Sequence, residues 1–180
     1  VIGNKVLSTC NSQPFTVPLA NGSGGDVIPT GTTYSWSAPQ VTGNMTGGQS
    51  GSGGSVTGTL INATNQPQTA TYIVTPTYSN GGTACAGGTF TVTVTVNPGP
   101  AIGNYSTSIC SGESYSLTPT NGLPTASTIV PDNTTYTWSA PSVTGISGTI
   151  AGTSSTSFSS GTLLNATNAP INVVYSLTPT

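Results

Sequence analysis

The sequence predicts an all-β protein built from two tandem β-sandwich repeats. Three observations lead to this prediction: apolar and hydroxyl-bearing residues alternate along short segments, Gly, Asn and Pro cluster between those segments, and the chain repeats itself after about one hundred residues. No segment of comparable length has helical periodicity. A chain of 180 residues has room for two ordinary domains.

The clearest strand signal lies in residues 89–96, which read TFTVTVTV. Period two with β-branched residues predicts a half-buried strand. The segments 15–19, 33–38, 56–60 and 70–75 alternate in a similar way, so we expect six or seven strands per repeat, enough for two packed sheets. The residues predicted to face the core in these five segments are Phe15, Val17, Leu19, Tyr34, Trp36, Ala38, Val56, Gly58, Leu60, Ala70, Tyr72, Val74, Phe90, Val92, Val94 and Val96.

The internal repeat is strong and keeps its order. Residues 33–43, TYSWSAPQVTG, return as TYTWSAPSVTG at 135–145 with nine of eleven positions identical, and GTLINATN at 58–65 returns as GTLLNATN at 161–168 with seven of eight identical. We therefore expect a complete repeat at 1–98, a Pro/Gly junction at 99–101, and a second repeat at 102–180 that stops before its last strand, within a continuing array. The aromatic residues predicted for the two cores are Tyr34, Trp36, Tyr72, Tyr136, Trp138 and Tyr175.

Three cysteines suggest a disulfide framework. Cys10 lies near the start of the first repeat, and we expect Cys85 in the turn before its last strand. We expect them to pair, closing a loop of 85 − 10 = 75 residue steps and contributing on the order of 4 kcal/mol. Cys110 matches Cys10, so we expect its partner beyond Thr180. Free buried thiols are the alternative.

Charged residues are almost absent: Lys5 is the only base, and Asp26, Glu113 and Asp132 are the only acids, with no His or Arg. Acid–base and nucleophilic catalysis need titratable groups held together, so we expect neither an enzyme nor a cofactor. Such a surface attracts neither nucleic acid nor anionic lipid. We also expect no membrane span, because no apolar run approaches the roughly 18 to 20 residues required.

Three local motifs have a functional and a plain interpretation. Asp26 and Asp132 lie in corresponding loops, but Ca²⁺ takes six to eight oxygen ligands, so we interpret each as a solvated loop acid. A Lys–Asn isopeptide bond would need Lys5, whose counterpart is Tyr105, so it would not be shared by both repeats. Asn-x-Ser/Thr triplets have the pattern of N-glycosylation acceptors, and we interpret them as chance matches to it. They begin at Asn21, Asn44, Asn62, Asn104, Asn133 and Asn165.

The segments TYTWSAPSVTGISG, GTLLNATNAPINVVYSLTPT and GTFTVTVTVNPGP resemble the PKD-like, immunoglobulin-like repeat of giant Bacteroidota cell-surface proteins. ICSGE at 109–113 and CAGGTF at 85–90 fit the same pattern. The first copy departs from it at 9–13, TCNSQ, and in a Gly-rich insertion near 47–54. The resemblance implies very long cell-surface adhesins, including gliding-motility adhesins, exported by the type IX secretion system.

We therefore expect an extracellular structural repeat of a stalk or filament. Its partners would be neighbouring repeats of the same chain, identical chains in a filament, or a surface or glycan ligand. Two alternatives stay open: a binding module whose loop at 43–55 recognises a glycan or surface, and ice binding through the T-x-T ranks of 89–95. The right-handed twist of sandwich sheets argues against the second.

Overall fold

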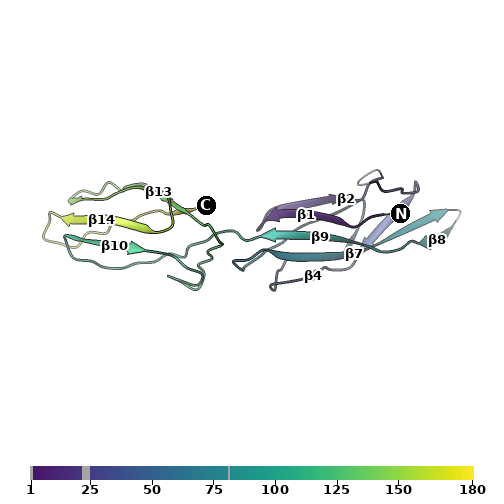
Figure 1. Cartoon of the computed structure of the whole chain (residues 1–180), viewed down its shortest axis with the longest axis horizontal. Helices are drawn as coiled ribbons and strands as arrows, with labels where there is room; N and C mark the ends of the chain where they lie inside the picture. The colour runs from purple at the N-terminus through teal and green to yellow at the C-terminus, as the bar shows by residue number, and fades with distance from the viewer. Residues whose placement is uncertain (1, 22–24, 81) are drawn as a thin grey trace. The chain divides into compact units, whose positions relative to one another are not determined.

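The computed structural model describes residues 2–21, 25–80 and 82–180. It divides the chain into two compact units, Val1–Gly99 (unit 1) and Pro100–Thr180 (unit 2), which are described separately. The described residues of both units form strands, turns and loops and no helix (Figure 1). The predicted all-β class is confirmed.

Unit 1 consists of a large sheet and a two-stranded sheet. The large sheet has the order β1-β9-β7-β3-β5, and β4 and β8 also pair with β7. The small sheet pairs β2 with β6. The bounds are β1 Lys5–Cys10, β2 Pro14–Pro18, β3 Thr32–Trp36, β4 Gln40–Val41, β5 Gly51–Ser52, β6 Ser55–Thr59, β7 Gln68–Asn80, β8 Thr83–Ala86 and β9 Phe90–Asn97.

Strand β9 occupies an inner position in the large sheet. It pairs in parallel with β1, from Lys5↔Val92 to Cys10↔Asn97, and antiparallel with β7, from Gln68↔Val96 to Val74↔Phe90. Its four apolar residues are all buried, while Thr91, Thr93 and Thr95 are half-buried on the other face. The alternation that predicted this strand therefore places its valines in the core.

The core of unit 1 lies between the two sheets and follows the predicted pattern except at Gly58, which is half-buried, and at one end of β3. Ala38 is exposed and outside the strand, which ends at Trp36. Pro39 explains the difference, because proline supplies no N–H and restricts the residue before it. The buried core residues are Phe15, Val17, Leu19, Tyr34, Met45, Val56, Leu60, Ala70, Tyr72, Val74, Phe90, Val92, Val94 and Val96.

Unit 2 forms two three-stranded sheets with the orders β10-β14-β12 and β13-β11-β15. Its core is built around Tyr136, Trp138 and Phe158, with Tyr115 and Tyr175 packed against it. Phe158 contacts the Trp138 ring with centroids 5.2 Å apart and the Tyr175 ring with centroids 4.8 Å apart. The strands are β10 Glu113–Leu117, β11 Tyr136–Trp138, β12 Ile146–Ser147, β13 Gly152–Ser155, β14 Phe158–Asn165 and β15 Thr178–Pro179.

The six aromatic residues that the sequence placed in the cores differ in burial. Tyr34, Tyr72, Tyr136 and Trp138 are buried. Trp36 and Tyr175 are half-buried and pack against the edges of their cores.

Candidate functional site

The cysteines of unit 1 are too far apart to bond, so the predicted disulfide between Cys10 and Cys85 is corrected. Cys10 of β1 faces Asn97 of β9. The preceding β9 residue, Val96, faces Gln68 of β7, so Cys10 lies level with position 67, just before β7 begins. Cys85 lies in β8, rather than in a turn, and faces Tyr78. A separation of 78 − 67 = 11 residues along a strand is about 35 Å. A disulfide needs Cα atoms within about 7 Å.

All three cysteines, Cys10, Cys85 and Cys110, are free and exposed. The alternative of buried thiols is therefore also wrong. Cys110 precedes β10 and lies in a turn in which its backbone N–H donates to Oε2 of Glu113 at 2.8 Å. Thiols at the surface are available for reaction with another chain or another unit.

The loop acid Asp26 is buried, which corrects its interpretation as a solvated residue. Its carboxylate accepts hydrogen bonds from the Lys5 ammonium and from the backbone N–H of Gly3, the latter at 2.8 Å. The side chains of Lys5 and Asp26 are only 11% and 2% exposed. The Lys5 and Gly3 hydrogen bonds hold the pKa of Asp26 below its ordinary value of 3.8.

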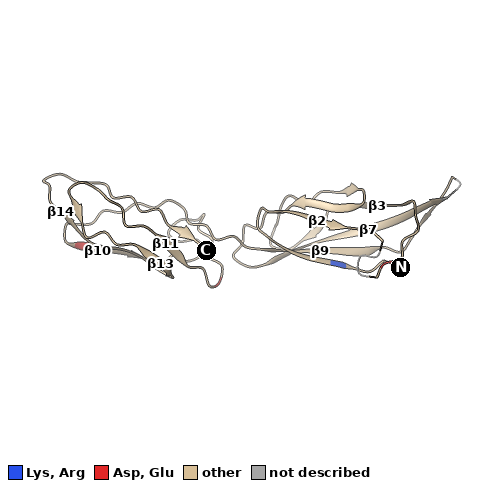
Figure 2. Ribbon diagram, turned by 90° about the horizontal axis from the view of Figure 1, so that it is seen from above, with Lys and Arg blue, Asp and Glu red and all other residues tan. Residues whose placement is uncertain are grey.

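The second loop acid, Asp132, is exposed, and Tyr105 replaces the lysine. Tyr105 stacks on Tyr115 with ring centroids 6.2 Å apart and planes inclined by 20°. Among the described residues, no three His, Cys, Asp or Glu side chains lie together as a metal site would require. Figure 2 shows how little of the ribbon carries charge.

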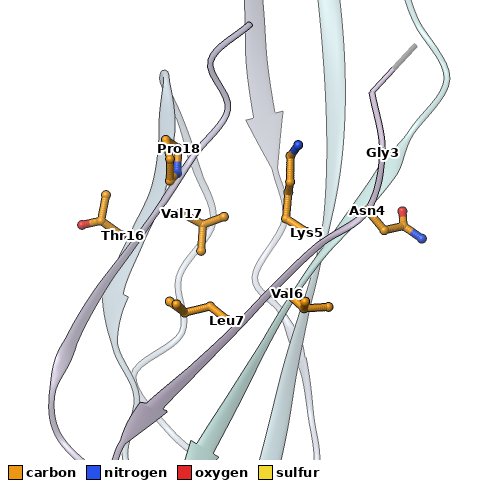
Figure 3. A pocket seen from close by; sticks show the side chains of 8 residues that line it. All are labelled: Gly3, Asn4, Lys5, Val6, Leu7, Thr16, Val17 and Pro18. Carbon is orange, nitrogen blue, oxygen red and sulfur yellow. The ribbon is translucent and has the colours of Figure 1, made fainter. Parts of the chain in front are cut away.

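A shallow groove of about 280 Å³ lies between β1 and β2, at a side where the two sheets of unit 1 meet. Lys5 and Leu7 of β1 and Val17 of β2 border it (Figure 3). The volume is at the lower limit for small-molecule pockets. Its one charged group, the Lys5 ammonium, is bonded to Asp26. We assign this groove a packing role.

Each tryptophan packs over a glycine of a neighbouring strand. Trp36 pairs with Gly51 and Trp138 pairs with Gly152. A methyl group at Gly51 would lie 2.8 Å from Cζ2 of Trp36, and one at Gly152 would lie 2.3 Å from Cη2 of Trp138. Only glycine leaves room for either indole ring.

The Gly-rich stretch of the first copy therefore has a counterpart in the second, and its interpretation as an insertion is corrected. Gly47 and Gly148 both have positive φ, and a methyl group at either would lie 2.2 Å or less from a carbonyl oxygen, that of Thr59 or Thr162. These glycine pairs are hard to recognise in the sequence, because the surrounding segments of both copies consist largely of Ser, Thr and Gly. The signal that remains is a glycine 15 or 14 residues after each tryptophan, since 51 − 36 = 15 and 152 − 138 = 14.

The side chain of Asn62 is a buried hydrogen-bonding centre of unit 1. Its Nδ2 donates to the carbonyl oxygens of Gln66 and Val96 at 2.8 and 2.9 Å. Its Oδ1 accepts from the backbone N–H and the hydroxyl of Thr64 at 2.9 and 2.8 Å. Because Val96 belongs to β9, this one amide ties the loop after β6 to the inner strand of the large sheet.

Asn165 repeats the local part of this arrangement in unit 2. Its Nδ2 donates to the Ala169 carbonyl oxygen at 2.8 Å, and its Oδ1 accepts from the N–H and hydroxyl of Thr167 at 2.9 and 2.7 Å. The Asn-Ala-Thr triplets at 62–64 and 165–167 therefore form the same structural turn in both units. Their exact recurrence within the two copies was the available signal.

The outer face of the large sheet carries hydroxyls in register. Thr93 faces Thr71 and Thr95 faces Thr69 across the β9–β7 ladder, and all four are half-buried. On the other side of β9, Val6 and Ser8 of β1 face Thr93 and Thr95. These residues are uncharged, so the face combines the methyl and hydroxyl groups of its threonines with Val6 and Ser8.

These features define a class of protein: a β-sandwich repeat whose polar and special residues serve packing and chain connection. Residues 8–100 match the PKD-like domain family, which is 100 − 8 + 1 = 93 of the 180 residues, and the chain belongs to this family. Neither the curated proteins nor the solved structures contain a match to the chain. PKD-like domains are typically extracellular modules. The described residues contain no helix that is long and apolar enough to cross a membrane.

Proposed function

We propose that the chain is a mechanical segment of a long secreted cell-surface adhesin, in which each unit is a rigid bead and the Pro-rich junction connects beads. Adhesion, with gliding motility as a more specific setting, and export by the type IX system follow from the resemblance to giant Bacteroidota adhesins. The role is structural and not enzymatic. Cell-surface location belongs to the same proposal.

One observation carries the mechanical part: the first and last strands of unit 1 pair in parallel. β1 and β9 share a register of six residue pairs, from Lys5↔Val92 to Cys10↔Asn97. The chain therefore enters unit 1 at one end of this ladder and leaves it at the other. Tension between the chain ends acts along the strands and loads all ladder hydrogen bonds together, whereas a hairpin geometry would load them one at a time.

Single-molecule force spectroscopy tests this proposal on the full chain. With handles at the two chain ends, we expect a distinct force peak followed by a length gain of about 30 nm as unit 1 extends. The matched control uses the same protein with Cys85→Ser and Cys110→Ser and places one handle on the exposed thiol of Cys10 and the other at the C-terminus. In this geometry the applied force separates β1 from β9 starting at the Cys10 end of the ladder, so the hydrogen bonds break one after another. We therefore expect a severalfold lower unfolding force. Equal forces in the two geometries would refute the mechanical role.

A second candidate function is binding to an ordered, hydroxyl-rich surface such as ice. The registered threonines at positions 69, 71, 93 and 95 favour it, since neighbouring strands space such hydroxyls by about 4.8 Å and successive ones by about 6.7 Å. Thermal hysteresis of the wild-type chain, lost in Thr93→Lys, would support it. Absence of hysteresis in the wild type would eliminate it and leave the mechanical proposal untouched.

A further inference from the structure

In unit 1, β9 lies between two strands whose sequences both have counterparts in unit 2. It pairs in parallel with β1 and antiparallel with residues 68–74 of β7. The internal repeat aligns β1 with residues 105–110 and residues 68–74 with 171–177, by the offsets 110 − 10 = 100 and 178 − 75 = 103. Unit 2 thus contains the two segments that would flank such a strand, and none of its strands lies between them.

The backbones of these two flanking segments are unpaired. Neither segment lies in a strand, and no backbone hydrogen bond joins 105–109 or 171–176 to another described residue. Free N–H and C=O groups along a sheet edge are the groups to which a further strand adds. Edges that stay free are commonly protected by charged residues or proline, and 105–110 and 171–177 contain neither. Both segments are therefore open edges.

The core-facing residues of 171–177 are less covered than their counterparts in unit 1. In unit 1 these residues are at most 1% exposed: Ala70, Tyr72 and Val74. In unit 2 they are only half-buried: Val173, Tyr175 and Leu177. The residues that share the core with them in unit 1 include the apolar face of β9, which consists of Phe90, Val92, Val94 and Val96. What unit 2 lacks is therefore the apolar face of one strand.

The other flank is also less covered. Leu7 of β1 is half-buried and packs against the core of unit 1, whereas its counterpart Thr107 is exposed. Tyr105, the counterpart of Lys5, is exposed as well, and its ring stacks on Tyr115. Neither flank carries a charged side chain, so an uncharged segment matches both of them.

We propose that unit 2 is a strand acceptor, which binds an extended segment of another polypeptide chain between residues 105–110 and 171–177. The segment has the pattern of β9, with valine or phenylalanine at every second position and uncharged polar residues between them. It runs parallel to 105–110 and antiparallel to 171–177, as β9 does between its own neighbours. Backbone hydrogen bonds on both sides hold it, and its apolar face covers the half-buried residues of the core. The inference does not depend on the mechanical role of unit 1.

The strand register of unit 1 defines how the bound segment is oriented. The first residue of β9 faces Val74, the counterpart of Leu177. Near its other end, β9 faces Gln68, the counterpart of Ile171. The N-terminal end of the bound segment therefore lies beside Leu177 and its C-terminal end beside Ile171.

Hydrogen exchange of the full chain in the presence of a synthetic peptide tests the proposal. The peptide has the sequence of residues 88–97 followed by two lysines, which keep it soluble. We expect saturating peptide to slow exchange in 171–177 at least about tenfold, because the backbone amides become hydrogen-bonded. Exchange in 68–74 should not change, because β9 already occupies the corresponding place in unit 1. A folded chain whose 171–177 segment gains no protection would overturn the inference.

The matched control is the same peptide with Val92→Thr and Val94→Thr. It keeps the length, the charge and the strand propensity, but it places hydroxyls on the face that becomes buried. We expect it to bind at least about tenfold more weakly, and equal protection by both peptides would refute the proposed site. A nitroxide on the N-terminus of the first peptide should broaden the NMR signals of Leu177, and one on its C-terminus those of Ile171. The opposite pattern would refute the proposed orientation and with it the site.

A fusion removes any limit set by peptide solubility. Residues 88–97 are joined after Thr180 by a Gly/Ser linker of 87 − 78 + 1 = 10 residues, the number between Gly88 and Thr77, the counterpart of Thr180. Tethering raises the effective concentration, so we expect a higher unfolding midpoint of unit 2 than in a fusion that carries the control segment. Equal midpoints of the two folded fusions would count against the acceptor site.

A second copy of the chain is the competing occupant of the two open edges. If the wild-type chain dimerises without peptide and thereby protects 105–110 and 171–177, pairing of unit 2 with itself replaces the proposed strand acceptor. We expect instead that sedimentation shows a monomer at the concentration used for exchange. None of these outcomes changes the force measured for unit 1, so the mechanical proposal is tested separately.

Discussion

Units 1 and 2 share their sequence motifs but differ in how completely their sheets form. In unit 1, the segment 68–74 lies in β7, pairs with β9 over its whole length, and buries Ala70, Tyr72 and Val74. In unit 2, the corresponding segment 171–177 alternates between half-buried and exposed residues without strand pairing. The described residues of unit 2 contain no strand that corresponds to β9.

The difference shows what an inner strand contributes. Tyr175 occupies the place of Tyr72 and faces the core, yet it stays half-buried while Tyr72 is 1% exposed. Side-chain alternation directs a segment toward the core, but hydrogen bonds from a neighbouring strand are needed to complete the sheet. Hydrogen exchange measured peptide by peptide reports the two units separately, and two of the predictions below use it.

The largest effect is expected from placing a charge in β9. Val94→Asp puts a carboxylate at a fully buried position, and we expect unit 1 to lose about 4 kcal/mol or more. Exchange in 68–74 should then approach that of 171–177. Thr93→Asp, one residue away on the outer face, should cost about 1 kcal/mol or less. Similar costs for the two variants would show that β9 does not complete the core of unit 1.

The second prediction concerns the two tryptophan–glycine pairs. We expect Gly152→Ala to cost unit 2 about 2 to 3 kcal/mol, because the added methyl meets a buried indole that has no room to move. Gly51→Ala should cost unit 1 less, since Trp36 is half-buried and can shift toward solvent. Thermal unfolding with tryptophan fluorescence measures both. A larger loss from Gly51→Ala would contradict this reading of the pairs.

The third prediction compares the two asparagines. Asn62→Ala removes the donor to Val96 in β9 and leaves buried carbonyl groups unpaired, and we expect a loss of about 2 to 3 kcal/mol. Asn165→Ala acts on a half-buried site whose side-chain hydrogen bonds, among the described residues, stay within its own loop, and we expect a loss of about 1 kcal/mol. Denaturant titration followed by exchange in β9 and in β14 measures the two losses. Equal losses would mean that the link to β9 contributes nothing.

How far the sequence predicts this molecule depends on the range of the contact. The strand 89–96 and its buried face follow from alternation alone, because side-chain direction is a local property. The Cys10–Cys85 prediction failed because it needed two strand registers. The register of β1 on β9 pairs residues that are 87 positions apart in the sequence, and the register of β8 on β7 pairs Tyr78 with Cys85, seven positions apart. Asp26 was misinterpreted for the same reason, because its partner Lys5 lies 21 positions away in the sequence. The recurring Asn-Ala-Thr turn was visible in the sequence, but its role was not recognised.

The fourth prediction is a difference in acid response. The pKa of Asp26 is lower in the folded than in the unfolded chain, so this residue stabilises unit 1 above about pH 4, and that contribution is lost as pH falls through the folded pKa. The unfolding midpoint of unit 1 should thus be flat from pH 7 to about 5 and fall below about 4. Asp26→Asn should remove most of this dependence. If the wild type and the variant fall in parallel, Asp26 is not its source.

The smallest effect is expected at Tyr72 and its counterpart Tyr175. The Tyr72 hydroxyl is buried without a hydrogen-bond partner among the described residues, and burial raises its pKa above 10.0. Tyr72→Phe removes an unpaired polar group, so we expect no loss and a gain of up to about 1 kcal/mol at neutral pH. The Tyr175 hydroxyl instead donates to the Ser160 carbonyl oxygen at 2.5 Å, so Tyr175→Phe should cost unit 2 about 1 kcal/mol. Each effect is measured as a shift in the unfolding midpoint of its unit. Opposite signs at these equivalent positions would establish that the incomplete sheet of unit 2 provides a hydrogen-bond partner for a hydroxyl that the core of unit 1 leaves unpaired. A loss in Tyr72→Phe as large as that in Tyr175→Phe would show that the Tyr72 hydroxyl has a partner in solution.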